Sequence, residues 1–199
     1  MKLTAVERRK LFAMPNPVTI TGRTSSITNS FVNSIIPVVE PTDAEIENAL
    51  DILGMQDQMC CAYCGDQHTE WDHLRPLVVD KMPTGYISEI HNLVPSCGKC
   101  NQSKGNKDWY PWMFGRARLS PASRGITGFA ARAERLKAYE AWAEPIKINF
   151  EGLVGSDIWN THWSNHRHLI ALMRDAQDVA SQIREKVRCT YLEKDPTRP

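Results

Sequence analysis

Two closely spaced cysteine pairs constrain the fold of this chain more than any other feature of its sequence. Cys61-Ala-Tyr-Cys64 and Cys97-Gly-Lys-Cys100 are both Cys-x-x-Cys motifs, and 32 residues separate them. Two such motifs supply four thiolates, which is the ligand set of a tetrahedral structural zinc site. In a reducing compartment this clustering favours a metal site over disulfide bonds. The sequence therefore predicts that these four cysteines hold one zinc ion.

The cysteine pattern leaves alternatives open. Unrelated buried thiols, or a single thioredoxin-like redox pair, would also contain a Cys-x-x-Cys motif. Cys60 directly precedes Cys61 and could replace it in a looser Cys-x-x-x-Cys spacing. Cys189 lies far from both pairs along the chain, and we interpret it as a spare thiol.

The overall composition is that of an ordinary globular protein. The chain has 199 residues, with 24 Lys and Arg against 23 Asp and Glu, which predicts one domain or a small catalytic core with extensions. This excludes a disordered charged tail, a collagen-like repeat and a disulfide-rich miniprotein. No run of 18 apolar residues exists, and charged residues occupy positions 7–10, where a signal peptide would be apolar. We expect a cytoplasmic protein with no membrane partner.

Local patterns predict helices on both sides of the cysteine region. Thr42 and Glu45 form a capping box, and apolar residues spaced three and four positions apart follow it. Gly54 ends this predicted helix. Further helices are expected at about 129–142 and 166–188, whereas residues 1–38 are interpreted as short strands and loops. The last helix has an apolar stripe that we expect to be core, with a dimer contact as the alternative. The stripe consists of Leu169, Leu172, Ala176, Val179 and Ile183.

Positive charge is concentrated between Lys99 and Lys137. This stretch holds nine Lys and Arg residues against only two acids, Asp108 and Glu134. Interleaved aromatic residues make a composition that can bind phosphates and stack on bases, or alternatively a solvated face over a buried aromatic cluster. The aromatic residues are Trp109, Tyr110, Trp112 and Phe114. The candidate nucleic-acid contacts are Lys104, Lys107, Arg116, Arg118 and Arg124.

A second set of candidate residues lies between the two cysteine motifs and directly after the second one. It consists of the pair Asp72-His73, then Asn92, then Asn101 directly after Cys100, and then Lys104-Gly105. In this order, residues 59 to about 110 resemble the HNH endonucleases. The resemblance implies a ββα-metal core, with strands near 69–74 and 90–95 and a helix that opens around residue 100.

The resemblance also implies roles for these residues. His73 would be the general base, Asp72 and Asn101 would bind Mg²⁺ or another divalent cation, and Asn92 would brace the loop that carries His73. The residue types suit this chemistry, because a neutral imidazole is available near pH 7 and hard cations prefer oxygen ligands. Thiolates are soft ligands and would hold zinc instead. Many members of the family have His where this chain has Asn101, which leaves the preferred metal open.

Each assignment has a structural alternative. His91, next to Asn92, is the chief rival for the role of general base. Asn101 could cap a helix, and a cap does not exclude metal ligation. Lys104 and Lys107 lie one helical turn apart, where they could contact a phosphate or simply be solvated.

Together these features predict an α+β protein with three segments: an N-terminal extension (1–58), an HNH core with a four-cysteine zinc site (59–113) and a mainly helical region (114–199). Polar residues between Thr19 and Asn33, and the loop 116–124, are candidates for reading base edges. The expected function is metal-dependent hydrolysis of double-stranded DNA, with 5′-phosphate and 3′-hydroxyl products, by a homodimeric type II restriction enzyme. The alternatives are a phage, homing or repair nicking nuclease, and a non-catalytic zinc-stabilised module that binds nucleic acid.

Overall fold

A computed structural model of the chain describes residues 3–11 and 14–194. The chain divides into two compact units, and the boundaries fall within helices. Unit 2 comprises Thr28–Thr161, and unit 1 combines the described residues up to Ile27 with those from His162 onward. Unit 2 contains all residues between the two cysteine motifs. The three-segment division made from the sequence stays a prediction, because compactness does not report which segment performs which function.

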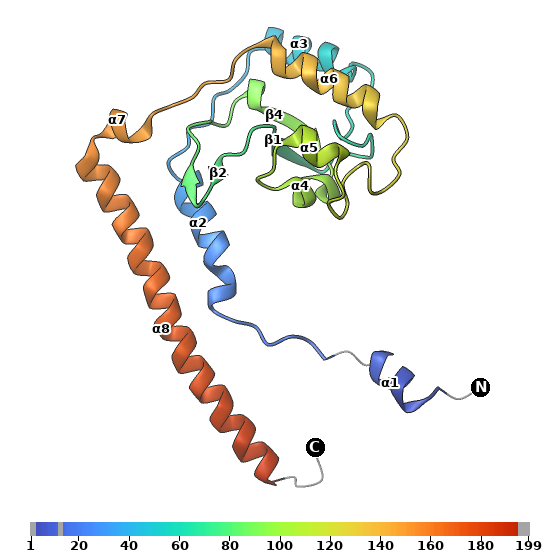
Figure 1. The fold of residues 1–199 in the computed structure, drawn as a ribbon. Coiled ribbons are helices and arrows are strands. Elements are labelled where there is room, and N and C mark those ends of the chain that lie inside the picture. Colours follow the sequence, from blue (N-terminus) through green and yellow to red (C-terminus); the bar gives the residue numbers. More distant parts are fainter. Residues whose placement is uncertain (1–2, 12–13, 195–199) are drawn as a thin grey trace. The chain divides into compact units, whose positions relative to one another are not determined.

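A two-stranded antiparallel sheet and a short helix lie at the centre of unit 2. Strand β1 (Glu70–His73) pairs with β4 (Leu93–Ser96), so that Asp72 lies opposite Val94, and α4 (Gly98–Lys104) follows directly (Figure 1). The second strand begins later than expected, because Ile90–Asn92 form the 3-10 turn η2. The mixed helix-and-strand class and the ββα arrangement are thus confirmed.

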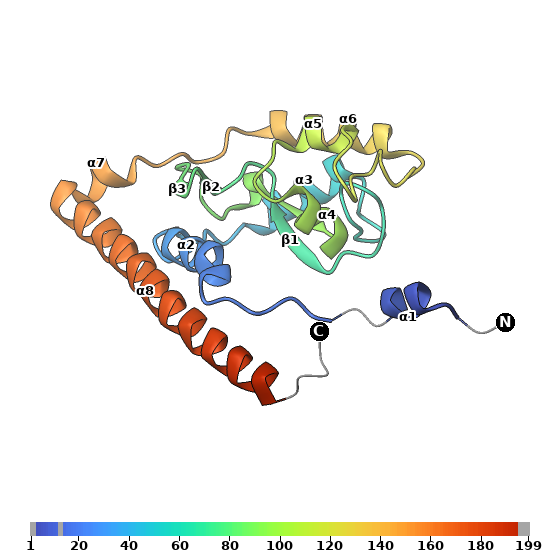
Figure 2. The ribbon, with the colours of Figure 1, turned by 60° about the horizontal axis from the view of Figure 1, so that its bottom comes forward.

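Helices α3 (Asp43–Leu53) and α6 (Phe129–Trp142) pack against each other beside this sheet (Figures 1 and 2). The capping box of Thr42 and Glu45 is formed, and Gly54 ends α3 in the left-handed conformation, as the sequence predicts. Apolar residues of α6 recur at three and four on its buried face, as expected. The fully buried side chains of the core include Tyr63, Leu74, Met113, Leu136 and Tyr139.

The aromatic residues that follow α4 divide between the core and the surface. Helix α5 (Trp109–Phe114) buries Trp109 and Trp112, whose indole nitrogens donate to Glu140 and Ser103. Tyr110 and Phe114 remain exposed on the same helix. Trp109 and Trp112 are therefore structural, whereas Tyr110 and Phe114 pack against each other at the surface.

A tight hairpin and an extended return segment complete unit 2. Strands β2 (Val78–Val79) and β3 (Met82–Pro83) are joined by Asp80 and Lys81, both with positive φ, as a two-residue hairpin turn of this twist requires (Figure 2). After α6, the chain runs back along Gly85 and Tyr86, where Ile148 donates its N–H to Gly85, and then enters α7 (Phe150–Val154).

The expectation of short strands in residues 1–38 is wrong. The described part of this segment forms α1 (Ala5–Leu11), the turn η1 (Thr21–Arg23) and α2 (Thr24–Asn33). Helix α2 is rich in Ser, Thr and Asn, but it buries Thr28 and Val32, which lie four positions apart. Such residues cost only a few tenths of a kcal/mol each in helix propensity, so burial of one helix face decides the outcome.

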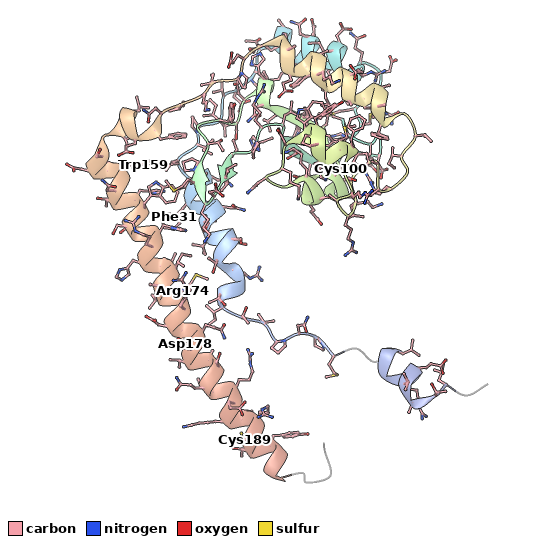
Figure 3. The ribbon with its side chains drawn as sticks, viewed as in Figure 1. Phe31, Cys100, Trp159, Arg174, Asp178 and Cys189 are labelled. Atoms are coloured by element: carbon pink, nitrogen blue, oxygen red, sulfur yellow. The ribbon has the colours of Figure 1, made fainter. Side chains whose placement is uncertain are left out.

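Helix α8 (Ser156–Lys194) is longer than the sequence indicates and leaves much of its apolar stripe exposed. Leu172, Val179 and Ile183 are each more than half exposed, so the expectation that they are core is wrong. The same helix carries Arg174, Asp178 and Cys189 (Figure 3). Periodicity identifies an apolar helix face, but it does not say whether the chain supplies an element to cover that face.

Among the described residues, no helix combines the length and the apolar character that crossing a lipid bilayer requires.

Candidate functional site

The four cysteines of the two Cys-x-x-Cys motifs form one buried group, called here the cysteine cluster. The Sγ atoms of Cys61, Cys64, Cys97 and Cys100 all lie within 4.8 Å of one another. Zinc–sulfur bonds of about 2.3 Å in a tetrahedron place the sulfurs about 3.8 Å apart, so these residues fit a single zinc ion. Cys100 lies inside unit 2 (Figure 3). Cys60, the alternative ligand, lies outside the cluster, and its sulfur instead accepts a hydrogen bond from Arg132.

The sulfurs of the cluster accept hydrogen bonds from Arg124 and from the cluster's own thiols. Arg124 Nη2 lies 2.9 Å from Cys100 Sγ and donates to it. Hydrogen bonds among the thiols lower the pKa of Cys64 and raise the pKa values of Cys61 and Cys100, so the cluster without metal favours a thiolate at Cys64. Arg124 was expected to contact DNA, but its guanidinium faces the sulfurs instead.

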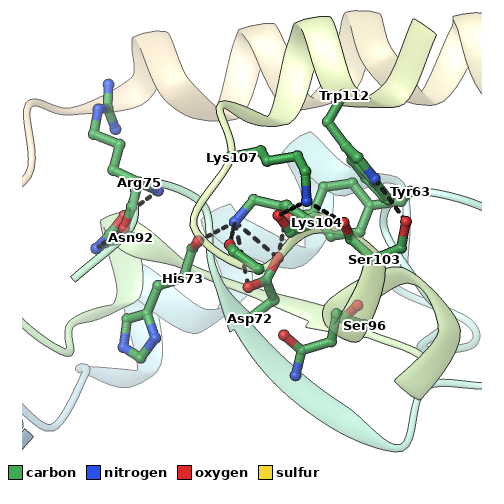
Figure 4. A network of polar contacts seen from close by, with 12 residues as sticks. Tyr63, Asp72, His73, Arg75, Asn92, Ser96, Ser103, Lys104, Lys107 and Trp112 are labelled. Atoms are coloured by element: carbon green, nitrogen blue, oxygen red, sulfur yellow. Dashed lines mark hydrogen bonds and ion pairs between the residues drawn. The ribbon is translucent and has the colours of Figure 1, made fainter. Parts of the chain in front are cut away.

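Asp72, on β1, is held by two buried partners. The Tyr63 hydroxyl donates to Asp72 Oδ2 at 2.6 Å, and Lys104 Nζ lies 3.2 Å from the same oxygen (Figure 4). Burial raises the pKa of the Asp72 carboxyl and lowers that of the Lys104 ammonium, whereas their mutual attraction opposes both shifts. Each side chain therefore depends on the other for its charge.

Lys104 does not have the position expected of a phosphate contact. Its side chain is 0% exposed, and its ammonium also donates to the carbonyl oxygen of His73 at 2.7 Å. It thus links α4 to the end of β1 from the inside of the domain. Lys107 is exposed, although its ammonium donates to the Ser103 carbonyl at 2.9 Å. The side chains of Arg116 and Arg118 are exposed as well.

His73 is the last residue of β1 and has a neutral imidazole near pH 7. Burial, together with the nearby Lys104 charge, lowers the pKa of His73 to about 4. Its Nε2 lies 2.9 Å from the Ser88 hydroxyl oxygen. When Nε2 carries the ring proton and donates it to that hydroxyl, Nδ1 is the nitrogen with the free lone pair. The residue can therefore accept a proton at Nδ1.

Asn92 is fully buried and braces the residues that follow His73. Its Oδ1 accepts from the Arg75 N–H at 2.8 Å, and its Nδ2 donates to the Arg75 carbonyl at 3.2 Å (Figure 4). Its own carbonyl accepts from the Leu74 N–H at 2.7 Å. These three bonds fix the chain directly after His73, which supports the bracing role implied by the family resemblance.

His91, the rival general base, has a different environment. Its Nδ1 pairs with the buried Glu89 carboxylate at 2.9 Å, and its ring packs against Trp142 at 4.4 Å between centroids. It does not line the cleft that His73 lines.

Asn101 lies in the first turn of α4. Its Nδ2 donates to Glu70 Oε2 at 2.6 Å, which leaves the amide oxygen as the atom that can bind a cation. The alternative that Asn101 caps this helix is wrong, because the N-cap residue is Cys97.

Asp72, His73 and Asn101 converge on one cleft of about 580 Å³ in unit 2, called here the His73 cleft. Neighbouring strand residues usually point to opposite faces, yet Asp72 and His73, the last two residues of β1, both line this cleft. One carboxylate and one amide oxygen fit a Mg²⁺-like cation, which usually takes its remaining ligands from water and substrate phosphate. Other lining residues are Asn29, Asn33, Ile36, Val38, Trp71, Pro76, Leu77, Val78, Ser88, Gly105 and Asn106.

Sequence reasoning missed three supporting residues: Glu70, Tyr63 and Ser88. Glu70 could have been found, because residues two apart on a strand share a face and Glu70 lies two positions before Asp72. No local pattern marks Tyr63 or Ser88, since both reach the site from loops.

Comparisons with known proteins agree with this geometry. Residues 61–107 match the family model described as HNH endonuclease. The chain is also 40% identical over 63 residues to the CRISPR-associated endonuclease Cas9 of Corynebacterium diphtheriae, which covers 29% of this chain and 5% of that relative. This chain thus spans about one twentieth of that relative's length. No solved structure matches the chain significantly. Residues 61–107 therefore form an HNH endonuclease domain.

Proposed function

We propose that this chain, with its HNH endonuclease domain at residues 61–107, is a divalent-metal-dependent endonuclease that hydrolyses phosphodiester bonds of double-stranded DNA. The observation that carries the proposal is the convergence of Asp72, His73 and Asn101 on one open cleft. The pKa of His73, about 4, provides a neutral base for the attack of water.

In this proposal His73 Nδ1 accepts a proton from a water molecule as its oxygen attacks phosphorus. The bond between phosphorus and the 3′ oxygen breaks, and the leaving 3′ oxygen takes a proton from solvent water, which gives a 5′-phosphate and a 3′-hydroxyl. Ser88 and the backbone fixed by Asn92 orient the imidazole. Asp72 and the amide oxygen of Asn101 would hold a divalent cation, which supplies neutralisation of phosphate charge and stabilisation of the leaving oxygen.

The experiment is supercoiled-plasmid cleavage with Mg²⁺ or Mn²⁺, comparing the intact protein with His73→Ala. His91→Ala is the matched control, because His91 is also partly buried in the domain but lies outside the cleft. Loss of a general base costs about 10²- to 10⁴-fold in rate, so His73→Ala should be nearly inactive and His91→Ala active. Equal cleavage by the intact protein and His73→Ala would disprove this mechanism. DNA binding without any cleavage by the intact protein would favour the non-catalytic binding module.

We further propose that the protein is a type II restriction enzyme that acts as a cytoplasmic homodimer. The exposed apolar stripe of α8 supports the dimer, and the cysteine cluster supports the compartment, because a reducing environment keeps the four thiols available as metal ligands. The double variant Val179→Glu/Ile183→Glu should be monomeric by light scattering if this stripe forms the dimer. Digestion of several genomic DNAs should give discrete bands, and a smear would exclude a restriction enzyme.

A further inference from the structure

Two asparagines of α2, called here the amide pair, line the His73 cleft. Asn29 and Asn33 lie one helical turn apart, are exposed, and line the same cleft as His73 and Asn101. Within the described part of the chain, neither carboxamide makes a hydrogen bond. Both groups are therefore available to a molecule bound in the cleft.

The chemistry of α2 favours contacts with bases over contacts with phosphates. Protein contacts to phosphate are made largely by Lys and Arg, and the ten residues of α2 include no charged side chain. A carboxamide presents a donor and an acceptor side by side, and this pattern matches the N6 and N7 edge of adenine. The amide pair is thus a neutral surface with the hydrogen-bonding pattern of a base reader.

The spacing of the amide pair fits neighbouring nucleotides. Residues four apart on a helix are separated by about 6 Å along its axis. Successive bases of one strand are about 3.4 Å apart, so the two amides span one or two base steps. Both lie in the cleft where the scissile phosphate would be bound, which places the contacted bases close to the cut.

Trp71 provides a second, independent feature of the same cleft. It precedes Asp72 on β1, its side chain is 54% exposed, and it lines the cleft together with the amide pair. A large exposed indole beside a polar site can stack on a base of any type. This also indicates that bases, in addition to the backbone, enter the cleft.

We infer that Asn29 and Asn33 hydrogen-bond to adenine edges next to the scissile phosphate, with Trp71 stacked on a base, so that α2 sets the sequence preference of cleavage. This inference rests on the proposed endonuclease function. It assigns specificity to an element outside the HNH domain, at residues that have no role in the proposed hydrolysis.

The test is cleavage of a duplex library with randomised sequence by the full chain, followed by sequencing of the cut ends. The intact protein should favour adenine at one or two positions beside the cut. Asn29→Ala/Asn33→Ala should reduce that preference by about 5- to 150-fold per contacted base. Asn48→Ala, an exposed asparagine of α3 outside the cleft, is the matched control and should keep it.

A change in which base is preferred beside the cut is stronger evidence than a loss of base preference. Asn33→Asp replaces a donor–acceptor group with an acceptor, so one position should change from adenine towards cytosine, whose N4 group donates. An unchanged base preference in both variants would overturn the inference, as would a uniform loss of cleavage without any change in preference. Absence of cleavage by the intact chain would overturn the proposed function itself and the inference with it.

Discussion

The same seven-residue helix, α4, contributes residues to the cysteine cluster and to the His73 cleft, yet the two sites differ in completeness and in access to solvent. Cys100 points into the buried cluster, where four sulfurs can satisfy a zinc ion without help. Asn101, the next residue, lines the cleft, where Asp72 and Asn101 are the two proposed oxygen ligands of a cation. A closed ligand set stabilises the fold, whereas an incomplete one leaves positions for water and substrate. Changes on the two sides of α4 should therefore have different consequences.

The largest effect is expected on the cysteine side. Cys97→Ser should abolish stoichiometric zinc binding and unfold the domain, because structural zinc contributes about 10–16 kcal/mol in small domains, as much as a typical total stability. Zinc analysis and circular dichroism measure both effects. Cys60→Ser should keep the metal, since Cys60 lies outside the cluster. Retention of zinc by Cys97→Ser would contradict the four-thiolate site.

A variant of Lys104 tests whether residues on the cleft side of α4 also stabilise the fold. Lys104→Met should lower the free energy of unfolding by about 3–5 kcal/mol, because it leaves the buried Asp72 carboxylate without its countercharge. Urea denaturation of the zinc-loaded protein measures this change. The double variant Lys104→Met/Asp72→Asn should recover part of the loss, and the exposed Lys107→Met should change stability by less than about 0.5 kcal/mol. A single variant as stable as the intact protein would show that the ion pair is unimportant.

A variant of Glu70 tests whether the orientation of the Asn101 amide, the proposed cation ligand, affects metal affinity. Glu70→Ala removes the acceptor that holds the Asn101 amide, so affinity for Mn²⁺ should fall by about 10- to 100-fold with little change in folding. Calorimetric titration of the zinc-loaded protein measures the affinity. Asp66→Ala, which removes an exposed acid nearby, controls for the lost charge. Equal affinity losses in both variants would indicate a general charge effect instead of orientation.

The smallest effect is expected at Ser88. Ser88→Ala removes one hydrogen bond to His73, and a single bond contributes about 0.5–1.5 kcal/mol, so the cleavage rate should fall by about 2- to 12-fold. Single-turnover kinetics at saturating Mg²⁺ measure this rate, with Ser123→Ala as a control outside the cleft. A loss as large as that of His73→Ala would mean that Ser88 takes part in the chemistry.

The parts of the site that were predictable from the sequence are those with strict spacing. The cysteine motifs, the Asp72-His73 pair and the capping box of α3 are local patterns with one physical interpretation each. The convergence of Asp72, His73 and Asn101 followed from the family resemblance, and the assigned roles of these residues stay proposals.

The parts that were not predictable depend on tertiary packing. The burial of Lys104 is decided by Asp72 and by the His73 carbonyl, which lie about thirty residues earlier in the chain. The helical state of α2 is decided by burial of Thr28 and Val32, although its composition favours turns. Exposure of the α8 stripe depends on which elements cover it, and periodicity carries no such information.

The hydrogen bond from Arg124 to Cys100 has a consequence for the durability of the domain. A zinc ion with four thiolates carries a formal charge of −2, and one guanidinium at 2.9 Å offsets half of it. A sulfur whose lone pair accepts an N–H is less electron-rich, and electron-rich, accessible sulfurs are the ones that oxidants attack first. The loop that carries Arg124 contributes no residue to the cleft, yet its guanidinium would help to protect the sulfurs of a zinc-loaded cluster from oxidation.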